Sequence, residues 1–216
     1  MTYLEIVNSV LIRLREREVS SVNDNSYSKL IGQFVNDSKR QVEDSWNWNA
    51  LRTTLTAETQ QGIYSYELNT ASNRFRILDV INDTSNWFME HRSTSWLNNQ
   101  FLNIDNQNQD APRYYGINGA SSDGDSYMDI FPIPDGVYNI RVNIVRPQAA
   151  LSEDSTEILV PAEPVILGAV ARAIGERGED GGISAAEATS LAASSLSDHL
   201  AIEANQFPHE LIWSEV

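Results

Sequence analysis

Aspartate and glutamate are the residues in this sequence that are best suited to acid–base chemistry, and there are 30 of them. A glycosidase needs two carboxylates that face one cleft. Because acidic residues are so numerous, composition alone produces many candidate pairs, and no spacing selects one of them. The sequence therefore predicts no catalytic residue, and we expect a protein that is not an enzyme.

The three histidines do not form a ligand set. His91, His199 and His209 are far apart, and none lies in the HExxH pattern that places two histidines on one helix face. The glycine-rich run at residues 175–182 lacks the lysine and the serine or threonine of a phosphate-binding loop. We predict no zinc site and no cofactor.

One short acidic loop resembles part of a calcium site. It contains Asp123, Gly124, Asp125 and Asp129. An EF-hand also needs a further glycine and a terminal glutamate at fixed positions, and both are absent here. We expect the segment SSDGDS (121–126) to be a hairpin loop, and we predict no metal.

The formal net charge of −15 argues against a surface that grips nucleic acid. Affinity for DNA grows with the number of cationic contacts to phosphate. Two interpretations of the acidity remain open. Either it lets DNA slide past a surface without sticking, because like charges repel, or it only keeps the protein soluble.

Trp46 and Trp48 form an aromatic pair at the end of a clearly patterned helix. Residues two apart on a helix do not share a face. One ring should enter the helical part and the other the β-rich part, or the helix should end between them. We predict that the pair forms a joint between two domains. Base stacking is the alternative, but it needs nearby cations that are scarce here.

Aromatic residues also alternate along the predicted strands. Alternating aromatics commonly pack in a core, and the alternative is a surface that holds a glycan. The candidates for the second role are Tyr64, Tyr66, Trp87, Trp96, Tyr114 and Tyr115.

The composition places the chain among folded proteins. A chain of 216 residues can bury roughly 70% of its unfolded surface. It contains no cysteine, so no disulfide or thiolate site is predicted. We expect no secretory signal, because no basic region precedes the first apolar residues. We expect no membrane span, because no apolar run reaches about 18 residues.

Two helices are predicted at the beginning of the chain. Apolar residues at three- and four-residue steps predict a helix over about 2–17 and a second one over 27–46. Turn and cap residues at 23–26 separate them. Charged residues of the second helix, Lys39 and Glu43 among them, lie mostly away from its apolar face. We expect the two helices to pack as a hairpin.

From Arg52 onward the pattern changes to the alternation that is typical of strands. A turn at 132–136 contains proline, aspartate and glycine, which favour a chain reversal. We predict a short helix at 93–100 within a small antiparallel sandwich or open barrel. The predicted strands are 64–68, 75–81, 87–91, 113–118, 126–131 and 137–145.

After Pro147 the sequence becomes helical again. Pro161 and Pro164 favour a helix start, the glycines at 178–182 end that helix, and an alanine- and serine-rich helix covers about 184–205. We predict an α+β fold in which the N- and C-terminal helical pairs form a four-helix bundle with an inserted antiparallel β domain. The predicted domains are residues 1–51 with 161–206 for the bundle, 52–160 for the β-rich insertion and 207–216 for a C-terminal tail.

Two stretches of the sequence carry a resemblance to a known family. The first is the end of the second helix, with Val35, Asn36, Arg40, Val42, Glu43, Trp46 and Trp48. The second runs from PRYYGING (112–119) through MDIFPIPDGVYNIRVNIVRP (128–147) to EPVILGAVARAI (163–174). With the layout of nearly the whole chain, they resemble the head-to-tail adaptor (connector) proteins of short-tailed bacteriophages, the tail tubular protein A or portal-adaptor group.

This resemblance implies a structural virion protein. Such adaptors form a homo-oligomeric ring, typically a dodecamer, beneath the portal protein, and they join the capsid to tail nozzle or fibre proteins. The ring continues the DNA channel for genome ejection and passes DNA without sequence-specific binding. The implied location is the virion neck, after assembly in the host cytoplasm and with no membrane.

The resemblance also implies a role for the end of the chain. In such adaptors a C-terminal segment reaches the portal, and residues 207–216 match it by position. Phe207, Leu211, Ile212 and Trp213 are too apolar for an idle solvated tail, and tryptophan is favoured at interaction hot spots. We predict that they bind the portal. The alternative is that they fold back onto the core of their own subunit.

Two other functions remain open from the sequence. One is a glycan-binding or peptidoglycan-cleaving virion protein that acts through the β domain. The other is an ordinary bacterial interaction module.

Overall fold

The structure is a computed structural model that describes residues 1–68, 74–102, 109–122, 124–178 and 184–206. Its described residues divide into two compact units. The first contains residues 1–51 together with the described residues from 148 onward, and the second contains residues 52–147. The chain therefore leaves the helical unit at Leu51 and returns to it at Gln148.

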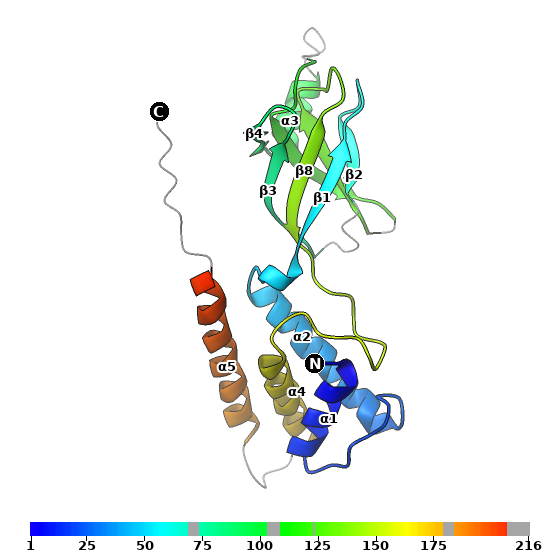
Figure 1. The fold of residues 1–216 in the computed structure, drawn as a ribbon, viewed down its shortest axis with the longest axis vertical. Helices are drawn as coiled ribbons and strands as arrows, with labels where there is room; N and C mark the ends of the chain where they lie inside the picture. The colour runs from blue at the N-terminus through cyan, green and yellow to red at the C-terminus, as the bar shows by residue number, and fades with distance from the viewer. Residues whose placement is uncertain (69–73, 103–108, 123, 179–183, 207–216) are drawn as a thin grey trace. The chain divides into compact units, whose positions relative to one another are not determined.

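Helices build the first unit. They are α1 (Tyr3–Arg13), α2 (Ser26–Ser45), α4 (Ala162–Arg177), α5 (Ala185–Gln206) and the short 3-10 helix η1 (Asn49–Leu51) (Figure 1). Helix α4 contacts each of the other three α-helices. It ends as predicted at Gly178, which adopts a left-handed conformation with φ of 64°.

Side chains cap the helix starts. Thr2 and Glu5 form a reciprocal capping box at α1, and Asn25 and Ser28 do the same at α2. At α5, the Ser184 hydroxyl accepts from the backbone N–H of Glu187, whose carboxylate in turn accepts from Ser184. These contacts satisfy N–H groups that have no partner inside the helix.

Helix α1 is shorter than the helix predicted over 2–17. It ends at Arg13, and Leu14 is its C-cap residue. Arg15 then adopts a φ of 60°, which breaks the helical path. The Leu11 carbonyl accepts from the backbone N–H of Glu16 at 2.9 Å, so the last turn stays hydrogen-bonded without further helix.

The core of the helical unit comes mainly from α1, α2 and α4. Its side chains lie on the apolar stripes that periodicity predicts. Helix α5 contributes one buried residue among those described, Ala188. The principal members of this core are Ile6, Val7, Val10, Leu11, Ile31, Val35, Val42, Val165, Ile166, Ala169 and Ala173.

Residues 148–160 return to the helical unit. The sequence places them in the β-rich insertion, but the backbone N–H groups of Tyr3 and Leu4 donate to the carbonyls of Thr156 and Asp154. Leu151 is buried as well. The segment lacks a helical period, yet hydrogen bonds to the start of α1 fix it against the helices.

Two four-stranded sheets make up the described β structure of the second unit. One sheet has the order β1-β8-β3-β4 and the other β2-β7-β6-β5. The open barrel is therefore wrong for these strands. The strands are β1 (Arg52–Glu58), β2 (Ser65–Leu68), β3 (Arg76–Asn82), β4 (Trp87–Phe88), β5 (Glu90–His91), β6 (Tyr114–Ala120), β7 (Ser126–Phe131) and β8 (Asn139–Val145) (Figure 1).

Both sheets contribute to one hydrophobic core. Strand β8 supplies Ile140, Val142 and Ile144, the alternating positions that the sequence predicts on one face. Strand β7 of the other sheet supplies Met128 and Ile130. The inward-facing side chains of both sheets therefore pack together in one core.

The strand predicted over 87–91 divides between the two sheets. Met89 is buried, and its backbone N–H donates to the Val80 carbonyl at 2.8 Å. The next N–H, of Glu90, donates instead to Arg113 at 2.9 Å. β5 pairs with β6 in parallel, unlike the antiparallel pairing predicted, because α3 (Thr94–Leu102) carries the chain across between them.

Helix α3 lies close to β6 at Gly116. A Cβ atom at Gly116 would lie 2.6 Å from Leu97 Cδ1 and 2.8 Å from the Arg92 carbonyl oxygen. Only a glycine fits without displacing backbone. This close approach fixes the helix on the β6 strand.

Candidate interaction site

The four residues predicted to bind the portal are not among those that the structure describes. Phe207, Leu211, Ile212 and Trp213 follow the last described residue, Gln206. Portal binding by these side chains remains a prediction.

Trp46 and Trp48 have different surroundings. Helix α2 ends at Ser45, one residue before the pair, and Trp46 is its extended C-cap residue. Trp48 is 2% exposed, and its indole Nε1–H donates to the Val42 carbonyl at 2.7 Å. Trp46 is 39% exposed. Trp48 thus packs on the last turn of α2, where the Val42 carbonyl also accepts from Ser45 Oγ at 2.6 Å. The role of the pair as a joint remains a prediction.

A buried ion pair holds the returning chain. Lys39 Nζ lies 2.8 Å from Glu43 Oε1 and donates to the Gln148 carbonyl at 2.8 Å. The Gln148 backbone N–H donates to Glu43 Oε1 at 3.1 Å. Both charged residues were expected away from the apolar face of α2. They are buried because residues 148–151 cover that side of the helix.

Asn36 extends the same contact by one turn of α2. Its side-chain amide donates to the Leu151 carbonyl at 3.1 Å and accepts from the Leu151 backbone N–H at 2.8 Å. Asn36, Lys39 and Glu43 therefore form a polar clasp for residues 148–151. The three residues lie on adjacent turns of the helix.

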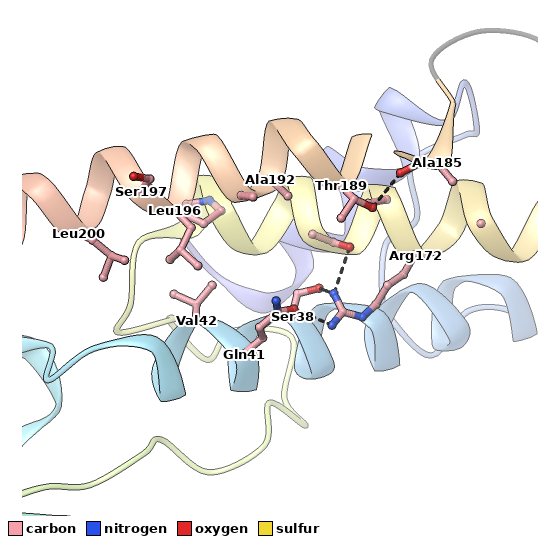
Figure 2. Close-up of a pocket in the computed structure, with 15 residues that line it drawn as sticks. Ser38, Gln41, Val42, Arg172, Ala185, Thr189, Ala192, Leu196, Ser197 and Leu200 are labelled. Carbon is pink, nitrogen blue, oxygen red and sulfur yellow. Dashed lines mark hydrogen bonds between the residues drawn. The ribbon is translucent and has the colours of Figure 1, made fainter. Parts of the chain in front are cut away.

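A groove of about 510 Å³ lies between α2, α4 and α5. Figure 2 shows Leu196 and Leu200 of α5 facing Val42 of α2 across it. Small residues line much of the rest, which lets another backbone approach closely. The small residues are Gly168, Ala171, Gly175, Ala185, Ala192 and Ala193.

Arg172 supplies a positive charge to the groove. Its Nη1 donates to Ser38 Oγ at 2.8 Å and to the Gly168 carbonyl at 3.3 Å, and its Nη2 donates to Gln41 Oε1 at 2.9 Å (Figure 2). All three acceptors are neutral. The guanidinium is thus fixed in place by uncharged partners.

The aromatic residues considered for glycan binding do not form one exposed face. Tyr115 lies in the core shared by the two sheets. Trp96 packs edge-on against Tyr114 with ring centroids 5.0 Å apart. The Arg113 guanidinium covers the ring of Trp87 at 4.6 Å. Of these four rings, Tyr115 is buried as the core interpretation predicts, whereas Trp87, Trp96 and Tyr114 are half-buried and pack on other side chains.

The remaining glycan candidates are also engaged within the β unit. Tyr64 lies 4.4 Å from Phe101 between ring centroids. The Tyr66 hydroxyl donates to the Ile63 carbonyl at 2.7 Å and accepts from the Gln60 backbone N–H at 2.9 Å. Tyr66 thus closes the loop that precedes β2.

Titration shifts in the described residues have local causes. A hydrogen bond to Asp135, 2.5 Å long, raises the pKa of Tyr138 to about 12. Hydrogen bonds from the Ser20 hydroxyl and from the backbone of Ser21 and Ser20 lower the pKa of Asp24. The pKa of Glu187 is lowered by its bonds to Ser184. These carboxylates belong to loops and caps.

Metal-binding residues do not gather in the described ranges, where no group of three or more histidine, aspartate and glutamate side chains is placed to hold an ion. His199 contacts the Ser195 carbonyl at 2.8 Å, and His91 packs edge-on against Tyr115. Asp123 and His209 lie outside the described residues. Across the described helices, none combines the length and apolar character of a bilayer span.

The groove and the exposed face of α5 are surfaces suited to contacts with other proteins. Such surfaces are typical of a structural protein. The family model for the SU10 adaptor protein matches residues 1–207, and the chain belongs to this family of phage head-to-tail adaptors. The resemblance predicted from the sequence is confirmed. No curated protein matches this sequence.

Family membership defines the general role of the chain. It is a structural adaptor of a bacteriophage, and portal and tail components in the virion neck are the partners that the family implies. The alanine- and serine-rich composition of α5 is visible in the sequence, and small residues let helices approach closely. Nothing in the sequence singled out Arg172, because arginines are scattered along the chain.

Proposed function

We propose that this protein is one subunit of a dodecameric ring that lies beneath the portal and joins the capsid to the tail. The match to the adaptor family over residues 1–207 carries this proposal. The ring continues the DNA channel through which the genome is ejected. Its role is assembly, without catalysis.

The helices of the first unit build the ring in this proposal. Helices α1, α2, α4 and α5 act as a four-helix bundle, and the two-sheet unit faces tail components. Trp46 and Trp48 form the joint between the two units. The small buried contribution of α5 supports this role, because such a helix retains surface for a neighbour.

The acidity of the chain suits a channel subunit. A net charge of −15 leaves few cations to neutralise phosphates. DNA then passes without sequence-specific binding, because like-charge repulsion shortens its contact with the protein.

The C-terminal residues dock the subunit on the portal in this proposal. The cluster comprises Phe207, Leu211, Ile212 and Trp213, and tryptophan at the centre of an interface often dominates affinity. A chain truncated after Gln206 is expected to stay folded and to lose portal binding. Helical circular dichroism reports the fold, and co-sedimentation with the portal protein of the same phage reports docking.

A matched pair of point variants sharpens this experiment. Trp213→Ala is expected to weaken portal binding by about tenfold or more. Phe88→Ala removes an aromatic side chain of β4 that is 71% exposed, and it is expected to leave binding unchanged. Normal docking of both the truncated chain and Trp213→Ala would show that the tail is not the portal-binding element.

A further inference from the structure

We infer that the groove between α2, α4 and α5 receives the outer face of α5 from a second copy of this chain. The two surfaces then repeat from subunit to subunit around the ring. This inference rests on the proposed ring and names the surfaces that would build it.

The first observation is that α5 has too little packing of its own. Helix α5 is 22 residues long, and Ala188 is its one buried residue among those described. Glu203 accepts from the Asn49 backbone N–H at 2.6 Å, and the rest of the helix lies chiefly against α4. Helices gain most of their stability from tertiary packing. A second contact surface would supply the packing that α5 lacks.

The second observation is an apolar stripe on α5 that faces solvent. Leu191 is 51% exposed and Ile202 is 59% exposed. They are eleven residues apart, which is about three turns or ~16 Å along one face of a helix. The groove is lined along α5 from Ala185 to Leu200, a length of ~22 Å. The stripe is therefore short enough to lie along the groove.

The stripe and the groove lie on opposite sides of α5. Residues two apart on a helix differ by about 200° in direction. Leu191 is therefore opposite Ala193, and Ile202 is opposite Leu200. Ala193 and Leu200 line the groove. Each subunit thus carries both halves of a contact, in the arrangement that a head-to-tail interface requires. Such contacts form a ring when the rotation between neighbouring subunits closes.

Charge complementarity favours a second copy of the chain as the occupant of the groove. Arg172 in the groove binds a hydroxyl, an amide and a carbonyl, all of them neutral. Asp198 is exposed on α5, seven residues after Leu191 and four before Ile202, so it lies on the same stripe. Helix α5 contains no lysine or arginine. Seating the stripe in the groove brings a carboxylate to a guanidinium that otherwise has neutral partners.

Charge reversal tests this pairing in assembly with the cognate portal protein. Asp198→Arg and Arg172→Glu are each expected to weaken ring assembly by about tenfold or more, because like charges then meet in the interface. The double variant restores opposite charges and is expected to recover assembly. Glu67→Arg, which changes an exposed charge on β2, is the control and is expected to assemble normally. Circular dichroism and thermal melting check the fold of each variant.

Disulfide trapping leaves Arg172 in place and removes only its bond to Gln41, whereas substitution of Arg172 loses all of its bonds within the subunit. The chain has no cysteine, so a Gln41→Cys copy and a Ser194→Cys copy can be mixed. We expect a mixed disulfide with portal present, and none when Ile12→Cys on α1 replaces Ser194→Cys. Gln41 lines the groove and Ser194 is exposed on α5.

The outcomes of these experiments distinguish failure of the inferred interface from failure of the proposed ring. The inferred interface is overturned if the wild-type chain forms rings while the single charge variants assemble equally well, the double variant does not recover, or no mixed disulfide forms. If the wild-type chain forms no ring with its portal, the proposed function itself fails.

Discussion

Lys39 Nζ and Glu43 Oε1 lie 2.8 Å apart on adjacent turns of α2, and their side chains are 3% and 1% exposed. Both atoms also contact the backbone of Gln148, at the point where the chain returns to the helical unit. Charges buried to this degree need partners, because an isolated charge in a protein interior is strongly unfavourable. The pair therefore belongs to the connection of residues 148–151 with α2.

Removing one member of this pair is expected to destabilise the helical unit strongly. Lys39→Met leaves Glu43 buried without its cation, which should lower the free energy of unfolding by about 3–5 kcal/mol. Lys29→Met is the matched control, because Lys29 is exposed on the same helix. Denaturant unfolding followed by helical circular dichroism measures both variants. Equal stability of the two variants would contradict the account of the ion pair.

Gly116 is expected to resist even the smallest side chain. Gly116→Ala places a Cβ against Leu97 and the Arg92 carbonyl, and overpacking of this kind typically costs about 1–3 kcal/mol. Gly136→Ala is the control, since nothing lies within 4 Å of a Cβ at that position. Thermal melting compares the two, and a harmless Gly116→Ala would show that α3 is not held closely on β6.

Trp48 and Trp46 are expected to differ in their contribution to stability. Trp48→Phe removes the buried indole N–H that donates to the Val42 carbonyl. The carbonyl keeps its bond from Ser45 Oγ, so loss of the indole bond should cost about 0.5–1.5 kcal/mol. Trp46→Phe changes a ring at the more exposed position and should stay within about 0.5 kcal/mol of the wild type. The measurement is the unfolding free energy of each variant. A larger loss for Trp46→Phe would assign the structural role to the other tryptophan.

Asp24 is expected to make stability depend on pH. Its folded pKa is lowered by hydrogen bonds from Ser20 and Ser21, so its contribution is present above the pKa of the unfolded chain and is lost as pH falls through the folded value. Asp24→Asn removes this titration. The stability difference between wild type and variant should therefore shrink from pH 7 to pH 3, and a difference that is constant with pH would rule out the carboxylate as its source.

Periodicity predicted most of the helices and strands because their buried faces are continuous stripes. The stripe of Ile140, Val142 and Ile144 identified β8, and Gly178 marked the end of α4. Both signals are local. They depend on residues within one element, which a single sequence displays directly.

Local periodicity and cap residues did not predict the contacts between distant segments of the chain. Lys39 and Glu43 carry charge, and only the return of Gln148 makes their side of α2 an interior. Met89 looks like the middle of one strand, although its neighbours pair with different sheets. The groove likewise depends on three helices that are separated along the chain.

Electron microscopy of the purified chain mixed with the portal protein of its own phage tests the central proposal most directly. We expect ring-shaped particles coaxial with the portal, containing twelve copies of the chain around an open channel. Wild-type chain that stays folded but forms no ring with the portal, or binds it at another place, would contradict the adaptor function proposed for this protein.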